Sequence, residues 1–388
     1  MFGWTHDVAA GVKAKSDGIL LSLPPEKSSV KNTGPQCFRS STPPKLPSTR
    51  TSWATTSFWR DHNAWLKEHG YILRARYQPD WIAWDHTTGC VLDATRVLDG
   101  LPVLFKQKGL PSDRSSTIDF RAEFELQIIR KFSSEPLASD PKNHCVHLVE
   151  ILDVPDVEKM NLIVIPLLFN WNYPRFAAIG EVVDLFSQIL EGLHFMHSHN
   201  AWHGDCKINN IMMDSAPIQV SPRTLDLSRK ARFRTRTQSP VRYYWIDFDH
   251  SGEHDPTNGS PLTELCYGGT HGVPEFAFQD RMCDPFAVDV WCLGNMIREY
   301  FTQVGFRGHT QDGGLQFMYK LVADMTHEDP TKRPNMDDVV HRFTKIKASL
   351  SQWKLRSRFA EEAENAFVGI YRTTAHWTHQ LRFAIKHA

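Results

Sequence analysis

Three short motifs occur in a fixed order in the second half of the chain, and they constrain its fold more than any other feature. They are Asp205-Cys-Lys-Ile-Asn-Asn210, then Asp247-Phe-Asp249 after the hydrophobic segment 243–246, and finally Val273-Pro-Glu275. A nucleotide-dependent phosphoryl transfer requires an Asp that receives the proton of the acceptor hydroxyl, a cation beside the moving phosphoryl group, and Asn and Asp ligands for a metal ion. The first two motifs contain these residue types in that order.

Each residue of these two motifs can be given a catalytic or metal-binding role. Asp205 is predicted to accept or orient the hydroxyl group of the acceptor, and Lys207 to stabilise charge on the transferring phosphoryl group. Asn210 and Asp247 are predicted to bind the metal ion. The alternative is a polar surface loop after a helix, and the strand-like segment that leads directly into Asp247 argues against it.

The spacing of the motifs resembles that of eukaryotic-type protein kinases. Lys207 follows Asp205 by two residues, as in serine/threonine protein kinases. Three later segments resemble the kinase motifs A-P-E, D-V-W-S-L-G and D-P-x-x-R-P: Val273-Pro-Glu275, Asp289-Val-Trp-Cys-Leu-Gly294 and Asp329-Pro-Thr-Lys-Arg-Pro334. The resemblance implies a buried ion pair between Glu275 and Arg333, and hydrogen bonds from Asp289 to the backbone of the catalytic loop.

A second family shares part of this pattern. The sequence His203-Gly-Asp205 also resembles the H-G-D-x-x-x-x-N motif of small-molecule phosphotransferases related to aminoglycoside kinases. Lys207 and the three later segments favour the protein kinases. The small-molecule enzyme remains the less favoured alternative.

The first half of the chain must supply a lysine that binds the nucleotide and a glutamate that positions it. Val103-Leu-Phe-Lys106 resembles the V-A-I-K motif, so Lys106 is the predicted lysine. Glu125, on the helix expected over 120–132, is its predicted partner, with Glu123 as the second choice. The simpler interpretation is that Lys106 and Glu125 are ordinary surface residues.

Three departures from the kinase pattern favour an alternative in which the fold binds partners without useful turnover, that is, a pseudokinase. No G-x-G-x-x-G precedes the strand that begins near Cys90, although backbone N–H groups of such a loop normally bind phosphate. Gly204 stands where the family has an arginine, and Asp249 replaces the glycine of D-F-G, whose flexibility lets that segment rotate.

The order of apolar patterns predicts a small mixed lobe followed by a mostly helical one, an α+β arrangement that resembles the two-lobed protein-kinase-like fold. Residues 1–56 are rich in Ser, Thr, Pro and Lys and are predicted to be a disordered tail. Short strands and one long helix over 57–170 predict a small β-rich lobe, and helical stripes over 171–346 predict a larger helical lobe with a basic insertion at about 215–242. Residues 347–388 are predicted to be a helical extension.

Two segments allow either a structural or a partner-binding role. Arg229-Lys-Ala-Arg-Phe-Arg-Thr-Arg236, inside the insertion, is predicted to be a solvated loop, with a nuclear-import signal or an acidic-partner patch as the alternative. The C-terminal extension is predicted to pack against the domain through apolar residues, with partner binding as the alternative. Those residues are Leu355, Phe359, Phe367, Tyr371 and Trp377.

Composition restricts the partners and the compartment. Lys and Arg total 44, as do Asp and Glu, so no net charge favours nucleic acid or a membrane surface. The longest apolar run is too short to span a bilayer, and no secretory signal is recognisable. The 7 cysteines contain no C-x-x-C pair and are predicted to be reduced thiols. We therefore expect an intracellular, cytoplasmic protein, with the nucleus as an alternative location.

Within the protein kinases, the chain most resembles a divergent kinase-like family of mushroom-forming (basidiomycete) fungi. The segments that carry this resemblance begin at Phe58, Phe132, Asp205 and Asp284. It implies a protein kinase that uses ATP and Mg2+ in the cleft between the lobes and phosphorylates Ser or Thr of a protein substrate. The sequence gives no indication of the oligomeric state.

Overall fold

The computed structural model describes most of the chain after the N-terminal tail. The described residues are 58–74, 91–108, 116–155, 157, 160–218, 233–264, 272–277, 282–302, 314–359 and 366–387. The predicted disordered tail, the segment 75–90 in which a glycine-rich loop was sought, and residues 229–232 of the basic segment lie outside them.

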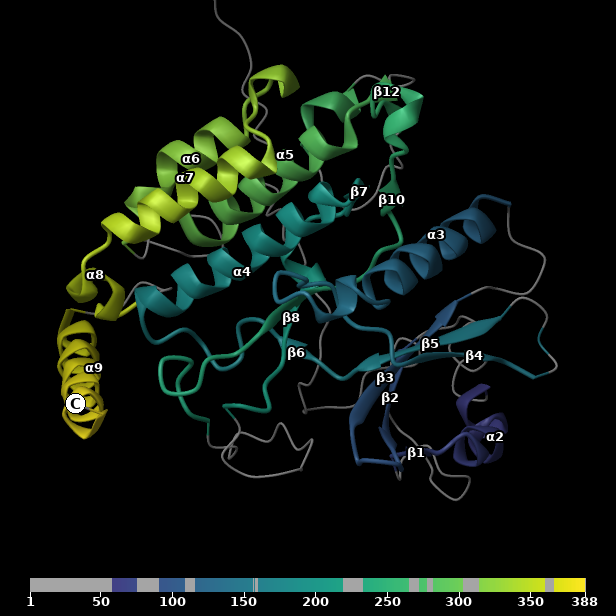
Figure 1. Cartoon of the computed structure of the whole chain (residues 1–388). Helices are drawn as coiled ribbons and strands as arrows, with labels where there is room; N and C mark the ends of the chain where they lie inside the picture. Colours follow the sequence, from purple (N-terminus) through teal and green to yellow (C-terminus); the bar gives the residue numbers. More distant parts are fainter. Residues whose placement is uncertain are drawn as a thin grey trace, which may run out of the picture. The chain divides into compact units, whose positions relative to one another are not determined.

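The small lobe is a five-stranded antiparallel sheet with the strand order β1-β2-β3-β5-β4 (Figure 1). Its strands are β1 (Tyr71–Leu73), β2 (Val91–Arg96), β3 (Pro102–Lys108), β4 (Glu150–Asp153) and β5 (Asn161–Pro166). Alternate side chains of a strand point to opposite faces, so Val103 and Phe105 of β3 enter the core of this lobe, where both are 0% exposed. Lys106 and Lys108 therefore lie on the other face.

Two helices accompany this sheet. Helix α2 (Asn63–Glu68) and the residues just before it pack against the core of the small lobe. Leu66 of α2 and Trp59 are buried, and the Trp59 ring stacks on Phe105. The other helix, α3 (Ser116–Phe132), packs its C-terminal half into the core of the larger lobe. Lys131 of α3 forms an ion pair with Glu253 at 2.6 Å, which ties the helix to β10 (Figure 1).

The larger lobe is mainly helical. Its helices are α4 (Ile179–Ser198), α5 (Pro285–Ile297), which continues as a π-helical turn over Arg298–Thr302, α6 (Tyr319–Met325) and α7 (Met336–Ser349). Short strands support the motif loops: β6 (Phe169–Asn170), β7 (Ala201–Trp202), β8 (Ile211–Met213), β9 (Tyr243–Trp245), β10 (Gly252–Glu253), β11 (Thr263–Glu264) and β12 (Met282–Cys283). Asp284 caps α5 by accepting hydrogen bonds from Phe286 N and Ala287 N, and Pro285 fits the first turn. The predicted two-lobed α+β fold is confirmed.

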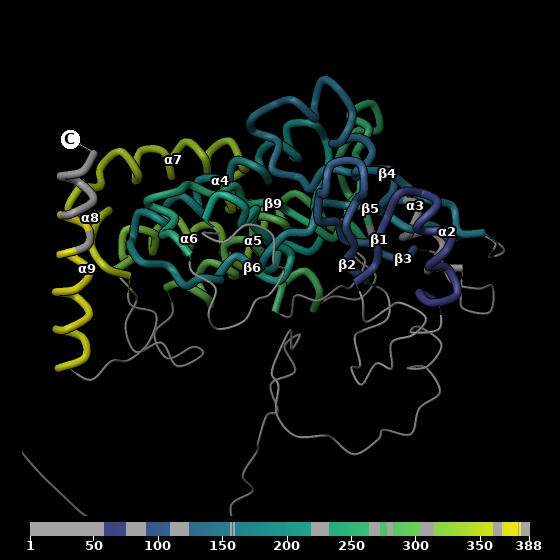
Figure 2. Tube along the Cα trace, turned by 90° about the horizontal axis from the view of Figure 1, so that it is seen from below, coloured from purple at the N-terminus to yellow at the C-terminus, as the bar shows by residue number. Residues whose placement is uncertain are grey.

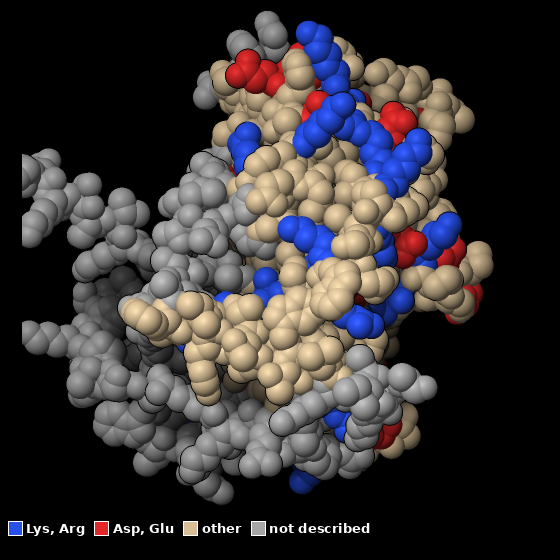
Figure 3. Space-filling model, turned by 90° about the vertical axis from the view of Figure 1, so that its left-hand side faces the viewer, with Lys and Arg blue, Asp and Glu red and all other residues tan. Residues whose placement is uncertain are grey.

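The C-terminal extension forms α8 (Gln352–Arg356) and α9 (Ala366–His387) at the end of the larger lobe away from the sheet (Figures 1 and 2). The prediction that its apolar residues pack against the domain is right for Phe359, which is buried, and wrong for Phe367 and Tyr371, which are 83% and 75% exposed. Figure 3 views this side of the molecule, where Lys and Arg side chains lie among uncharged ones. Helical periodicity therefore identified an apolar face but not whether anything covers it.

The described part of the basic insertion is less solvated than predicted. Arg236 is only 4% exposed. Its guanidinium group donates a hydrogen bond to Trp171 O at 2.8 Å and lies over the Phe176 ring at 4.3 Å. Arg236 is thus a structural residue that anchors the end of the insertion, because a planar guanidinium can stack and donate at once.

The sequence predicts reduced thiols and no apolar segment long enough to span a bilayer. Cys145, Cys206, Cys283 and Cys292 are buried, and none of these four forms a disulfide bond among the described residues. Among the described helices, none has both the length and the apolar character needed to cross a bilayer.

Candidate active site

Asp205 lies in the loop between β7 and the 3-10 turn Ile208–Asn210, and its side chain is buried in the larger lobe. Its Oδ2 atom accepts a hydrogen bond from Asn210 Nδ2 at 2.9 Å and contacts the Lys207 ammonium group. Its Oδ1 atom is also buried, yet it has no hydrogen-bond partner among the residues that the structure describes. Buried polar atoms are nearly always paired, so the unpaired Oδ1 atom is an unusual feature of this loop.

Asn210 connects the two motif loops. Its amide nitrogen donates to both the backbone oxygen and Oδ2 of Asp205, each at 2.9 Å, which directs the amide oxygen away from Asp205. Its backbone oxygen accepts a hydrogen bond from Ile246 N at 3.0 Å, one residue before Asp247. A backbone hydrogen bond therefore joins the loop of Asp205 to the segment of Asp247.

His203 also lies between the two predicted aspartates. Its Nδ1 faces Asp205 N at 3.3 Å and its Nε2 faces Ile246 O at 3.2 Å, an arrangement that fits a neutral ring protonated on Nε2. Burial lowers the pKa of His203, while Asp289, Asp205 and Asp247 act in the opposite direction. Both predicted aspartates thus act electrostatically on the same buried imidazole.

Asp289 of α5 stabilises the backbone of this loop. Its fully buried carboxylate accepts hydrogen bonds from His203 N at 2.7 Å and Gly204 N at 2.8 Å, and it faces His197 Nε2 at 3.1 Å. Burial raises the pKa of Asp289, but the hydrogen bond and electrostatic interaction with His197, together with the hydrogen bond from His203 N, hold the pKa below its ordinary value. The hydrogen bonds inferred for Asp289 from the kinase resemblance are present.

Gly204 occupies its position for a steric reason. Its φ is +77°, and a Cβ atom there would lie 2.0 Å from His250 O. Any side chain would collide with that backbone oxygen, and the left-handed conformation adds strain. An arginine, which the kinase pattern has at this position, does not fit this backbone. The local fold therefore explains why this chain has glycine there.

Lys106, Glu125 and Asp247 come together from three separate elements. Lys106 Nζ lies 2.7 Å from Glu125 Oε1 on α3 and 2.5 Å from Asp247 Oδ1. Asp247 has φ +67°, a left-handed conformation that Asp tolerates better than most residues. The positive φ falls on Asp247, not on Asp249, so the replaced glycine of D-F-G needs no special conformation in this arrangement.

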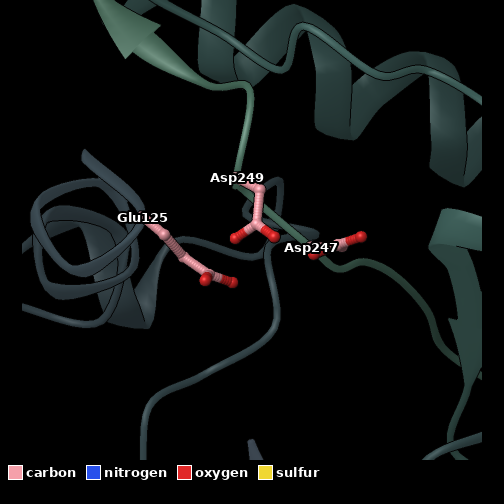
Figure 4. A group of neighbouring side chains, drawn as sticks. All are labelled: Glu125, Asp247 and Asp249. Carbon is pink, nitrogen blue, oxygen red and sulfur yellow. The ribbon is translucent and has the colours of Figure 1, made fainter. Parts of the chain in front are cut away.

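The sequence interpretation missed two members of this cluster, Lys108 and Asp249. Lys108 Nζ contacts both Glu125 Oε2 and Asp249 Oδ1, and Lys106 Nζ lies 3.4 Å from the same Asp249 oxygen. Figure 4 shows Glu125 on the helix and Asp247 and Asp249 on the segment that approaches it. The period of a strand was a usable signal for Lys108, since residues two apart share a face.

The electrostatics of this cluster follow from its burial. Burial and the neighbouring Lys106 charge lower the pKa of Lys108 to about 8, although Asp249 and Asp247 oppose the change. Burial raises the pKa of Asp249, but the charges and hydrogen bonds of the two lysines outweigh it and lower the pKa. Oxygen atoms of Glu125, Asp247 and Asp249 lie within 4.8 Å of one another, and the two lysines offset part of this concentrated negative charge.

The predicted pair of Glu275 and Arg333 is present in the larger lobe. Arg333 Nη1 and Nη2 donate to Glu275 Oε1 and Oε2 at 2.6 and 2.8 Å. The Arg333 and Glu275 side chains are 1% and 9% exposed. This two-bond arrangement fixes the third motif to the segment that precedes α7.

Comparisons with known proteins agree with this arrangement. Residues 89–345 match the family described as the protein kinase domain. The probable serine/threonine-protein kinase MARK-A of Dictyostelium discoideum is 22% identical over 249 residues, covering 56% of this chain and 21% of the relative. Serine/threonine-protein kinase SIK2 of Gallus gallus is 21% identical (65% and 32% covered), and serine/threonine-protein kinase GRIK1 of Arabidopsis thaliana is 22% identical (57% and 56% covered). The chain spans less than two thirds of the length of each of these relatives.

Proposed function

This chain belongs to the protein kinase domain family, and we propose that it transfers the terminal phosphoryl group of ATP to a serine or threonine hydroxyl of a protein substrate. The observation that carries this proposal is the buried Asp205 carboxylate, of which one oxygen is held by Asn210 and Lys207 while the other has no partner among the described residues. An unpaired buried polar atom costs about 1–3 kcal/mol. An acceptor hydroxyl that donates to Oδ1 would remove this cost and be oriented for attack.

The remaining residues then have defined tasks. Lys106, positioned by Glu125, binds phosphate oxygens of the nucleotide, and Lys207 lies beside Asp205 to stabilise charge on the transferring group. The Asp247 carboxylate and the outward amide oxygen of Asn210 are the hard oxygen ligands that suit Mg2+. When bound, Mg2+ neutralises charge on the triphosphate.

We further propose the boundaries and location expected from the sequence: lobes over 57–170 and 171–346, an extension over 347–388, and a cytoplasmic or nuclear protein. The predicted relationship to basidiomycete kinase-like proteins also remains a prediction. A specific observation favours a pseudokinase as the second candidate. Lys106 is already paired with the carboxylates of Glu125 and Asp247, and Asp249 adds negative charge where phosphate would bind.

Thermal unfolding with and without Mg-ATP separates these candidates. A ligand at one hundred times its dissociation constant adds about 2.7 kcal/mol to the stability of the folded state. We expect a rise in Tm with Mg-ATP and none with Mg2+ alone. Absence of any shift at millimolar Mg-ATP would contradict the proposal and support a pseudokinase that does not bind nucleotide. An acceptor screen that labels a sugar or an amine but no protein would support the small-molecule alternative.

A further inference from the structure

Two lysines of β3 point toward the same site. Lys106 pairs with Val91 of β2 and Ile163 of β5 in the sheet, and Lys108 pairs with Asn161 of β5. Lying two residues apart, they share the face opposite the buried Phe105. Their side chains are 21% and 11% exposed, so Lys108 is even less accessible than the lysine predicted to bind the nucleotide.

The two ammonium groups have the same carboxylate partners. One Glu125 oxygen contacts Lys106 and the other contacts Lys108, while a single Asp249 oxygen contacts both lysines. The four side chains therefore form a closed ring in which positive and negative groups alternate. Because both lysines contact the same two partners, the ring brings the two ammonium groups close together.

Charge balance explains why a second lysine accompanies Asp249. Two ammonium groups face three carboxylates, those of Glu125, Asp247 and Asp249. Without Lys108, one ammonium group would face three carboxylates, an environment that repels a polyphosphate. The carboxylate that replaces the usual glycine therefore requires the second lysine if an anion is to bind here.

We propose that Lys108 is a second phosphate-binding lysine, and that Lys106 and Lys108 together bind phosphate oxygens of a nucleoside triphosphate. This inference rests on the proposed function. The sequence lacks the G-x-G-x-x-G motif whose backbone N–H groups normally bind phosphate, and two side-chain ammonium groups supply donors of the same kind. Without nucleotide, Lys108 is paired with Glu125 and Asp249.

The test compares the affinities of Mg-ATP and adenosine, measured by titration calorimetry on the full chain. For Lys108→Gln we expect the dissociation constant of Mg-ATP to rise about tenfold or more, the usual value of a charged hydrogen bond, while that of adenosine stays within about twofold. Lys108→Arg keeps the charge and should lie near wild type. Lys347→Gln, which removes a lysine that bonds to Ser187 in the larger lobe, is the matched control and should change neither constant.

Two results for Lys108→Gln would overturn the inference. If Mg-ATP and adenosine bind equally more weakly, Lys108 only supports the shape of the site. If the affinity of neither falls, Lys108 does not contact phosphate. Asp249→Gly opens the ring but leaves Lys108 free to bind phosphate, so Mg-ATP affinity should be kept or raised. A loss as large as that of Lys108→Gln would identify the pair as a structural latch. Failure of the wild type to bind Mg-ATP would instead refute the proposed function itself.

Discussion

The buried pair of Glu275 and Arg333 gives a prediction whose size follows from its geometry. Glu275→Gln preserves the shape of the side chain and removes its charge. The Arg333 guanidinium would then stay in a site where its side chain is 1% exposed, without the two bonds of 2.6 and 2.8 Å to a carboxylate. The substitution therefore leaves a buried charge without its counter-ion.

Breaking a buried pair in this way typically costs about 3–5 kcal/mol. Arg333 also donates to three backbone oxygens, to His327 O at 2.8 Å, Ala287 O at 2.9 Å and Glu328 O at 3.3 Å, and these bonds do not involve Glu275. These dipoles partly solvate the charge. We therefore expect a loss near the lower end of the range, about 3 kcal/mol in the free energy of unfolding.

Urea unfolding of wild type and Glu275→Gln at the same pH measures this loss. The matched control is Asp324→Asn, which breaks the pair of Asp324 with Arg342, whose side chains are 43% and 32% exposed. Exposed pairs contribute about 0–1 kcal/mol, so the control should lose no more than that. If both variants lost the same small amount, burial would not determine the strength of the Glu275–Arg333 pair.

Three further predictions concern stability. Gly204→Ala should lose more free energy of unfolding than Gly100→Ala, because both positions have φ above +70° but only Gly204 adds a backbone clash; equal losses would contradict this. Arg236→Lys should lose about 1–3 kcal/mol in urea unfolding, since Lys cannot both stack and keep the bond to a backbone oxygen; an unchanged midpoint would show the stacking to be dispensable. Burial lowers the pKa of His144, so the unfolded chain binds more protons than the folded chain below about pH 6.5. The free energy of unfolding should therefore fall from pH 7.5 to 5.5, and it should fall less in His144→Gln. Equal pH dependence of stability in the two proteins would contradict this.

Local patterns were sufficient to predict individual helices and strands. Alternation along β3 and the helical stripe of α4 depend only on neighbours in the chain, and both elements form where expected. The pairing of Lys106 with α3 also could be predicted, because the kinase resemblance specifies which helix faces which strand. The positions of Glu275, Asp289 and Arg333 followed from the same resemblance.

The remaining features depend on contacts between distant residues. The strand period places Lys108 on the same face as Lys106. Its partner Asp249 comes from the other half of the chain, and no local pattern predicts that these two residues meet. The role of Gly204 depends on the backbone of His250, and the burial of Arg236 depends on Trp171. Exposed Phe367 shows a further limit, since an apolar helix face has the same sequence whether or not it is covered.

Phosphoryl transfer from ATP labelled in its terminal phosphate, compared between wild type and Asp205→Asn, tests the central claim most directly. The variant keeps the size of the side chain and removes the carboxylate whose Oδ1 atom is unpaired among the described residues. We expect wild type to label serine or threonine in a protein, and the variant to lose about 100-fold or more in rate at unchanged Mg-ATP affinity. Equal labelling by the two proteins, or no labelling by wild type that binds Mg-ATP, would contradict the catalytic role of Asp205.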